Sequence, residues 1–286
     1  MKNWISKSKI LIVGLGLIGG SYARALGRLG CHVAAIDSDP KTIEYAIENG
    51  IVDKGSISPD PNLISNADAV IFGLYPEPFL GWIRDNQHLL KSGAMLTDVT
   101  GVKKCIVYKI QEILRPDVEF IAAHPMAGKE VSGVVNSDDC IFRDANYIVT
   151  PTEKNTDAAV EWCKKLGRIL GFMRISVLTP EEHDRMIAFV SQLTHCIAVS
   201  LMNCSENEHL ADYTGDSFRD LTRIANINDK MWSELFIDNK DDLLEVMDKF
   251  INEFKAFRGL LEEEDTDGLR EKMRLSTKRR KAFDKK

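Results

Sequence analysis

The chain has 286 residues, of which 44% are hydrophobic, so it can bury a full core and form one large domain or two ordinary ones. We expect two. The formal net charge is −6, which argues against a surface for nucleic acid, so an anionic ligand needs local positive charge. The composition therefore favours a small-molecule partner.

The 6 cysteines are scattered and include no CxxC pair, which favours reduced thiols over a disulfide framework or a metal site. The first residues, MKNWISKSK, lack the apolar core of a signal peptide. We find no apolar run that approaches the roughly eighteen residues of a membrane span. The expected protein is soluble and cytoplasmic, with no membrane partner and no bound metal.

Short β-branched runs alternate with helical patterns from Lys9 to about Pro180, as in a parallel sheet covered on both faces. Between these runs, segments such as 39–50 and 156–170 repeat apolar residues at three- and four-residue spacing. The pattern predicts an α/β domain over residues 1–180, with a doubly wound, Rossmann-like sheet. The expected strands are residues 9–14, 32–37, 69–74, 94–99, 119–124, 145–151 and 172–180.

The character of the chain changes after Pro180. The segment up to Cys204 contains no further glycine or proline, and everything downstream is helical in pattern with no clear strand. We therefore expect an all-α domain over residues 181–286. Because this domain is short and apolar on its helix faces, we expect it to form a homodimer.

A glycine-rich turn follows the first predicted strand. Gly14 allows the tight turn, Gly16 lets the backbone approach a pyrophosphate, and Gly19 permits close packing of the next helix. The phosphates then lie at a helix N-terminus, which puts Leu17 and Ile18 in the cofactor site. The alternative is a tight turn that binds nothing, but the surrounding strand and helix favour a dinucleotide.

Asp37 ends the second predicted strand, eighteen residues after Gly19. There a carboxylate can accept hydrogen bonds from the adenosine ribose hydroxyls, and its charge repels a 2′-phosphate. The expected cofactor is therefore NAD rather than NADP. Asp39, which precedes a proline, is the alternative acidic group and could instead cap the next helix.

His124 directly follows a predicted strand, in a loop at the carboxyl edge of the sheet. Oxidation of an alcohol requires a group that takes the hydroxyl proton as hydride leaves, and a histidine suits that task. A role limited to hydrogen bonding within the loop remains open. His183 resembles part of a metal site, but no partner has a ligand spacing with it, so we expect hydrogen bonding at a helix start.

Two further pairs lie on predicted helices. Gln192 and His195 are three residues apart on one face. Arg219 and Arg223 are four apart, a spacing that aims both guanidinium groups in one direction and suits carboxylates. The alternative for the arginines is a solvated surface with Asp220 and nearby acids as partners.

These segments, in this order, resemble the prephenate dehydrogenase family over roughly residues 9–235. The motifs are GLGLIGGS, LTDVTGVK, HPMAGKEVSG, HDRMIAFVSQLTH and FRDLTRIA followed by MW. The resemblance implies oxidation of prephenate, or of its amino analogue arogenate, with NAD or NADP. Loss of carbon dioxide then gives an aromatic ring, and the substrate lies between the two domains.

The resemblance also implies roles for single residues. His124 matches the histidine that accepts the proton of the ring C4 hydroxyl. Many relatives carry serine at Gly101, so Thr100 is the catalytic hydroxyl expected here. The expected substrate-binding residues are Arg223 for a carboxylate, Arg219 as a nearby cation, His195 and Gln192 in the pocket, and Glu130 as an acidic gate.

The sequence therefore predicts an NAD-dependent prephenate dehydrogenase of tyrosine biosynthesis, acting on a small dicarboxylate. Arogenate is the alternative substrate, which the charge of Lys129 disfavours. A dehydrogenase for another hydroxy acid and a noncatalytic NAD-binding sensor are further alternatives. Retention of both the candidate base and the carboxylate-binding arginines argues against the sensor.

Overall fold

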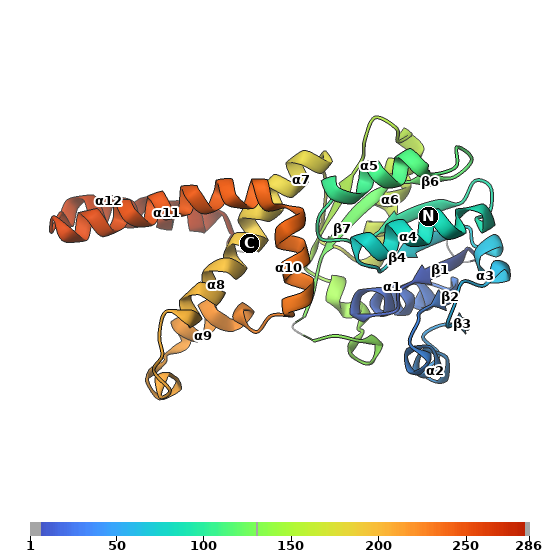
Figure 1. Cartoon of the computed structure of the whole chain (residues 1–286), viewed down its shortest axis with the longest axis horizontal. Coiled ribbons are helices and arrows are strands. Elements are labelled where there is room, and N and C mark those ends of the chain that lie inside the picture. Colours follow the sequence, from blue (N-terminus) through green and yellow to red (C-terminus); the bar gives the residue numbers. More distant parts are fainter. Residues whose placement is uncertain (1–6, 130, 284–286) are drawn as a thin grey trace.

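The computed structural model describes residues 7–129 and 131–283. Within them, six strands form a parallel sheet in the order β3-β2-β1-β4-β5-β6 (Figure 1). The order reverses between β1 and β4, which is where open α/β sheets bind their ligands. The strands are β1 (Lys9–Val13), β2 (His32–Ile36), β3 (Lys54–Ser56), β4 (Ala69–Phe72), β5 (Met95–Asp98) and β6 (Glu119–Phe120).

A second sheet of three strands, β7-β8-β9, extends the first among the described residues. Its strands are β7 (Ala122–Met126), β8 (Asn146–Thr150) and β9 (Arg174–Val177). Because β7 pairs antiparallel to β8, the predicted sheet is not parallel throughout. The strand predicted over 119–124 is two strands separated by Ile121, whose N–H donates to Leu96. His124 therefore lies inside β7 rather than in a loop after a strand.

Helices cover both faces of the sheets, and α2, α3 and α6 begin with a side-chain cap. Asp39 caps α2, so the alternative role proposed for it is the observed one. Thr156 caps α6, which ends at Gly171 with a left-handed φ of 93°. The helices are α1 (Leu17–Arg28), α2 (Pro40–Glu48), α3 (Pro61–Asn66), α4 (Pro76–Asn86), α5 (Lys104–Ile113) and α6 (Asp157–Leu170).

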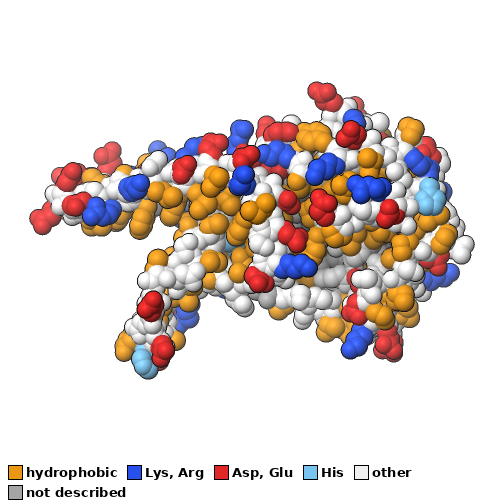
Figure 2. Space-filling view, in the orientation of Figure 1, with side chains coloured by type: hydrophobic (Ala, Val, Ile, Leu, Met, Phe, Trp, Pro, Cys, Tyr) orange, Lys and Arg blue, Asp and Glu red, His pale blue; other side chains and the backbone are white. Residues whose placement is uncertain are grey.

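The described residues from 178 onward form helices and turns only. They build two arms, α8 with α9 and α11 with α12, which project away from the sheets (Figures 1 and 2). A π-helical segment, Ala188–Gln192, joins the first two helices into one continuous run. The helices are α7 (Pro180–Ile187), α8 (Leu193–Asn203), α9 (Asp216–Thr222), α10 (Asp229–Asp238), α11 (Lys240–Glu262) and α12 (Thr266–Arg280).

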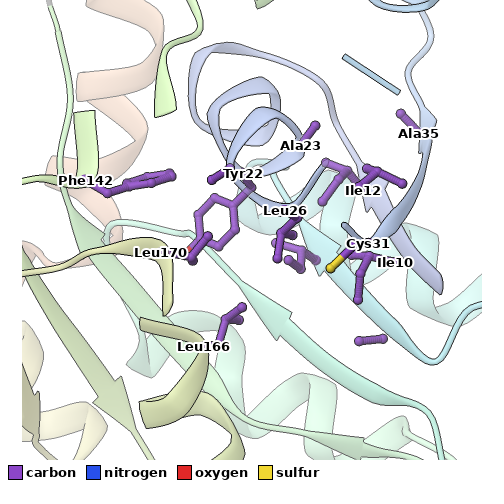
Figure 3. Packing of buried hydrophobic residues seen from close by; sticks show 14 of the residues in the cluster. Ile10, Ile12, Tyr22, Ala23, Leu26, Cys31, Ala35, Phe142, Leu166 and Leu170 are labelled. Carbon is purple, nitrogen blue, oxygen red and sulfur yellow. The ribbon is translucent and has the colours of Figure 1, made fainter. Parts of the chain in front are cut away.

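Two hydrophobic clusters lie on opposite faces of the main sheet. Alternate residues of β1 enter them: Ile10 and Ile12 pack with α1 and α6, whereas Leu11 and Val13 pack with α4 and α5. Figure 3 shows Tyr22 of α1 in the first cluster, among side chains of the sheet and of α6. The buried core of the helical part is much smaller and consists of Ala188, Leu193, Leu243 and Val246.

The helical part is fixed to the N-terminus of α5. Asp184 of α7 accepts hydrogen bonds from the backbone N–H groups of Lys103 and Lys104, both at 2.8 Å. The Lys104 ammonium also pairs with Asp242 of α11. Asn239 donates to the backbone oxygen of Asp184 at 2.9 Å. These bonds place the start of α7 directly beside β7.

One helical run in the described part of the chain, Pro180–Asn203, is long and apolar enough to cross a membrane, which differs from the expectation of no such run. Its polar residues nevertheless bond to other parts of the protein. Asp184 caps α5, and Gln192 bonds to Leu235 and Asn239. We therefore interpret the run as the central helix of the helical part.

Candidate active site

The glycine-rich turn has the geometry that dinucleotide binding requires. Gly14 has φ of 90° and donates its N–H to Ile36 at 2.8 Å, and a Cβ there would lie 2.5 Å from the oxygen of Gly73. A Cβ on Gly19 would collide with the backbone oxygen of Gly14. A Cβ on Gly16 would meet nothing within 4 Å. Gly14 and Gly19 are thus required by packing, whereas Gly16 leaves the backbone open to a ligand.

Helix α1 begins at Leu17 with no side-chain cap on its N-cap residue and no acidic residue in its first turn. Leu17 and Ile18 are partly exposed. Unpaired N–H groups at such a helix start attract phosphate. The predicted cofactor residues Gly14, Gly16, Gly19, Leu17 and Ile18 therefore share one turn.

Asp37 lies beside this turn at the end of β2. Its carboxylate accepts the N–H of Leu15 at 2.7 Å and that of Asp39 at 2.9 Å. A carboxylate has further lone pairs, so these bonds orient Asp37 without exhausting its capacity to accept ribose hydroxyls. The structure thus brings the acidic group and the glycine turn together.

His124 belongs to a line of three polar side chains. Its Nδ1 lies 2.9 Å from Nε2 of His183, and Nδ1 of His183 lies 2.7 Å from Oδ1 of Asp184. Burial lowers the pKa of His124 well below 6.5, and the nearby His183 and Lys103 side chains lower it further. His124 is therefore a neutral imidazole at pH 7, the form that can accept a proton.

Thr100 does not have the position expected of a catalytic hydroxyl. It is buried, and its hydroxyl bonds to Asp98 and to the backbone oxygen of Val102 and receives the ammonium of Lys103 at 3.1 Å. Asp98 and Val102 share the single O–H of the hydroxyl, and the Lys103 ammonium occupies one of its lone pairs. In the described structure this hydroxyl belongs to the buried network of Asp98 and Lys103, and its predicted catalytic role stays a prediction. The neighbouring Gly101, without a side chain, faces Leu235 of α10.

His195 stacks on Trp232 of α10, with ring centroids 3.7 Å apart and an angle of 30° between the planes. Its Nδ1 donates to the backbone oxygen of Ser191 at 2.9 Å, which leaves Nε2 as its second hydrogen-bonding atom. The pair joins α8 to α10. The ring of His195 is thus oriented by stacking on Trp232 and by the hydrogen bond to Ser191.

Gln192, the predicted companion of His195, is 1% exposed. Its amide nitrogen donates to Leu235 at 2.7 Å, and its oxygen accepts from Asn239 at 2.8 Å. Both ends of the Gln192 amide therefore bond to neighbouring helical segments, and its predicted contact with substrate stays a prediction.

The two arginines do not share one regular helix. Arg219 lies in α9 and pairs with Asp216 at 2.7 Å, with 61% of its side chain exposed. Helix α9 ends at Thr222, so Arg223 opens the following 3-10 turn and is exposed. The i, i+4 alignment predicted from the sequence is therefore interrupted, and the described partner of Arg219 is Asp216 rather than Asp220.

The loop after β7 holds the remaining expected residues. Glu130 lies outside the described residues. Lys129 pairs with Asp138 at 3.3 Å. Asp138, Asp139 and Cys140 could together hold a metal ion, but Asp139 pairs with Arg28 and Asp138 with Lys129. We therefore interpret these acids as members of surface ion pairs.

Sequence reasoning assigned no site role to several buried groups around His124. His183 was expected only to bond at a helix start, and Asp184 was not predicted at all. Asp98 and Lys103 form a fully buried ion pair at 2.7 Å. The adjacent His-Asp in the sequence is the one signal that could have indicated the line of side chains.

A sheet with a glycine turn after β1 and an aspartate after β2, a partly buried neutral histidine and an appended helical part define a two-domain, dinucleotide-dependent dehydrogenase. Two family descriptions match the chain: "Prephenate dehydrogenase, nucleotide-binding domain" over residues 22–171 and "Prephenate dehydrogenase, dimerization domain" over residues 179–275. The chain belongs to the prephenate dehydrogenase family. This confirms the family and the dehydrogenase class predicted from the sequence.

Comparison with individual relatives also supports membership of this family. Prephenate dehydrogenase of Bacillus subtilis is 33% identical over 92% of this chain and 72% of its own length. Cyclohexadienyl dehydrogenase of Zymomonas mobilis is 28% identical over 96% of this chain and 95% of its own. The structure of prephenate dehydrogenase from A. aeolicus with hydroxyphenyl propionate and NAD+ has a TM-score of 0.88, is 30% identical, and covers 97% of this chain and 98% of that one.

Proposed function

We propose that this protein oxidises prephenate to 4-hydroxyphenylpyruvate with NAD, releasing carbon dioxide, as a step of tyrosine biosynthesis in the cytoplasm. The observation that carries the proposal is the neutral, partly buried His124 in β7, beside the cofactor-binding sheet. A noncatalytic NAD sensor would have no use for such a base.

His124 takes the proton of the substrate C4 hydroxyl. Bound NAD supplies the acceptor for the hydride that leaves C4. The ring carboxylate then departs as carbon dioxide, and its electron pair makes the ring aromatic. The proton held by His124 returns to the phenolate oxygen, so the histidine is regenerated as a neutral imidazole.

The substrate has two carboxylates, and this acidic protein must bind them with local cations. We assign Arg223 to one carboxylate and place Arg219 and His195 nearby as supporting groups, with Glu130 as an acidic gate. Asp216 holds Arg219 in the described structure, so Arg219 has to exchange a partner before it contacts substrate. We assign the primary carboxylate contact to Arg223, which the family resemblance matches to the carboxylate-binding arginine.

Asp37 supports the choice of NAD. Its carboxylate is fixed beside the glycine turn by two backbone N–H groups. A 2′-phosphate at this place would meet an uncompensated negative charge. We propose that residues 1–180 form the cofactor-binding domain and residues 181–286 the substrate-binding and dimerisation domain.

The arms support a homodimer formed through the helical domain. Hydrophobic side chains gather on the side of the α11–α12 arm that faces the α8–α9 arm (Figure 2). The helical part buries few apolar residues of its own and exposes many, which is typical of an interface. The exposed side chains include Phe189, Val190, Met202, Phe250, Phe254 and Met273.

The decisive experiment follows reduced-nicotinamide absorbance with prephenate or arogenate, each with NAD or NADP. Reduction with prephenate and NAD supports the proposal. Activity restricted to arogenate overturns the substrate, and absence of activity in all four mixtures supports the sensor. Sedimentation of the same sample tests the homodimer, and a monomeric mass at micromolar concentration contradicts it.

A further inference from the structure

We propose that His183 and Asp184 are positioning residues that keep the hydrogen of neutral His124 on Nδ1 and so leave Nε2 as the base. This inference rests on the proposed function, in which His124 accepts the substrate proton. The three side chains come from β7 and α7, and they form a continuous line of hydrogen bonds of 2.9 and 2.7 Å.

The direction of these hydrogen bonds follows from Asp184. Its Oδ1 accepts the N–H of Lys103 and its Oδ2 accepts the N–H of Lys104, each at 2.8 Å. A carboxylate that receives an N–H on each oxygen at a helix start is ionised and can only accept. The hydrogen shared by Asp184 and His183 must therefore sit on Nδ1 of His183.

His183 then has to accept at its other nitrogen. It is fully buried, and this burial lowers its pKa, which Asp184 opposes. A neutral imidazole carries one N–H, so Nε2 of His183 holds a lone pair. Only the Nδ1–H form of His124 can donate to that lone pair. The second nitrogen of His124, Nε2, is then the one that can take a proton.

The charges around His124 make Asp184 the group that compensates a protonated base. The Lys103 ammonium disfavours a cation on His124, and Asp98 is already paired with that ammonium. Asp184 acts on His124 through His183, because the hydrogen bond to Asp184 orients the ring of His183 and that ring in turn orients His124. In the reaction an O–H bond of the substrate breaks and an Nε2–H bond forms, and no proton needs to move along the line.

The kinetic test compares His183→Leu and His183→Gln with His32→Gln as a control. His32 is 70% exposed in its side chain, at the opposite end of the parallel strands. We expect kcat to fall about 100-fold in His183→Leu, less in His183→Gln because its amide oxygen can accept from Nδ1–H, and not in the control. The KM for substrate and the affinity for NAD should change by less than about twofold.

A second measurement does not depend on activity. Nitrogen NMR of the full-length, ¹⁵N-histidine-labelled protein should show the hydrogen of His124 on Nδ1 in the wild type and a shift toward Nε2 in His183→Leu. A hydrogen on Nε2 in the wild type overturns the inference whatever the activity, as does an unchanged kcat in a folded His183→Leu. A wild type that oxidises no candidate substrate instead overturns the proposed function.

Discussion

Lys103 and Asp98 form an ion pair of 2.7 Å in which neither side chain has any exposed surface. Asp98 also accepts the N–H of Ala123 at 3.1 Å, and Lys103 donates to the oxygen of the same residue at 2.6 Å. The pair therefore holds β7 in place through both backbone polar groups of Ala123, the residue that precedes His124. It fixes the backbone from which the proposed base projects.

Lys103→Met should lower the free energy of unfolding by about 3–5 kcal/mol, because it leaves the buried charge of Asp98 uncompensated. Urea denaturation measures this loss. The double variant Lys103→Met with Asp98→Leu removes both charges and should recover part of it. A single variant as stable as the wild type contradicts the structural role of the pair.

His124→Asn should lower kcat by about 10²- to 10⁴-fold, because general-base catalysis contributes on that order. NAD binding, measured by titration calorimetry, should stay close to the wild-type value since the glycine turn lies elsewhere. Turnover near the wild-type rate removes His124 from the proposed role.

Arg223→Ala should raise the KM for prephenate by about 10- to 100-fold, the range expected for a hydrogen bond to a charged group. Arg219→Ala is the matched comparison and should have a smaller effect, because its guanidinium already pairs with Asp216. Steady-state kinetics at fixed NAD measures both. Equal KM values in the wild type and both variants would show that Arg223 does not bind the substrate.

Asp37→Ser should weaken NAD binding by about 10-fold or more through loss of charged hydrogen bonds to ribose. The affinity for NADP should rise relative to the affinity for NAD, because the repulsion between Asp37 and the 2′-phosphate is removed. Dissociation constants for both cofactors measure the change. An unaltered ratio of the two dissociation constants would show that Asp37 does not determine the choice between NAD and NADP.

The pH dependence follows from burial of His124, which lowers its pKa well below 6.5. His124 stays neutral at pH 6.5 and above, so kcat/KM should be flat there and fall only in more acidic solution. The free energy of unfolding should also decrease as pH falls below 6.5. The reason is that His124 binds a proton more readily in the unfolded chain than in the folded one. A rate that declines between pH 7.5 and 6.5 contradicts this assignment.

Local patterns in the sequence were sufficient for most of the fold. The apolar runs of β1 and β4 and the glycine turn were predictable from local sequence. Gly14 and Gly19 cannot be replaced there, because a Cβ on either would collide with backbone atoms. Strand β3, with the sequence Lys-Gly-Ser, was missed because it carries no apolar pattern. The antiparallel pairing of β7 depends on partners in β8 that no local signal reveals.

The candidate site was less predictable because its key contacts join distant segments. His124 and His183 are 59 positions apart, and their contact depends on how the helical domain meets β7. Thr100 was expected to face a substrate, yet its hydroxyl completes the buried network of Asp98 and Lys103. Residue type and spacing do not show whether a side chain points inward or outward.

Asp184 also links the orientation of the proposed base to the attachment of the helical domain. Its carboxylate is at once the attachment of the helical domain to α5 and the far end of the line that reaches His124. The glycine turn lies wholly within the cofactor domain, so a chain with its helical domain detached would retain the dinucleotide site. Such a chain would lack the bond between His183 and His124, so dinucleotide binding would be separable from the chemical step.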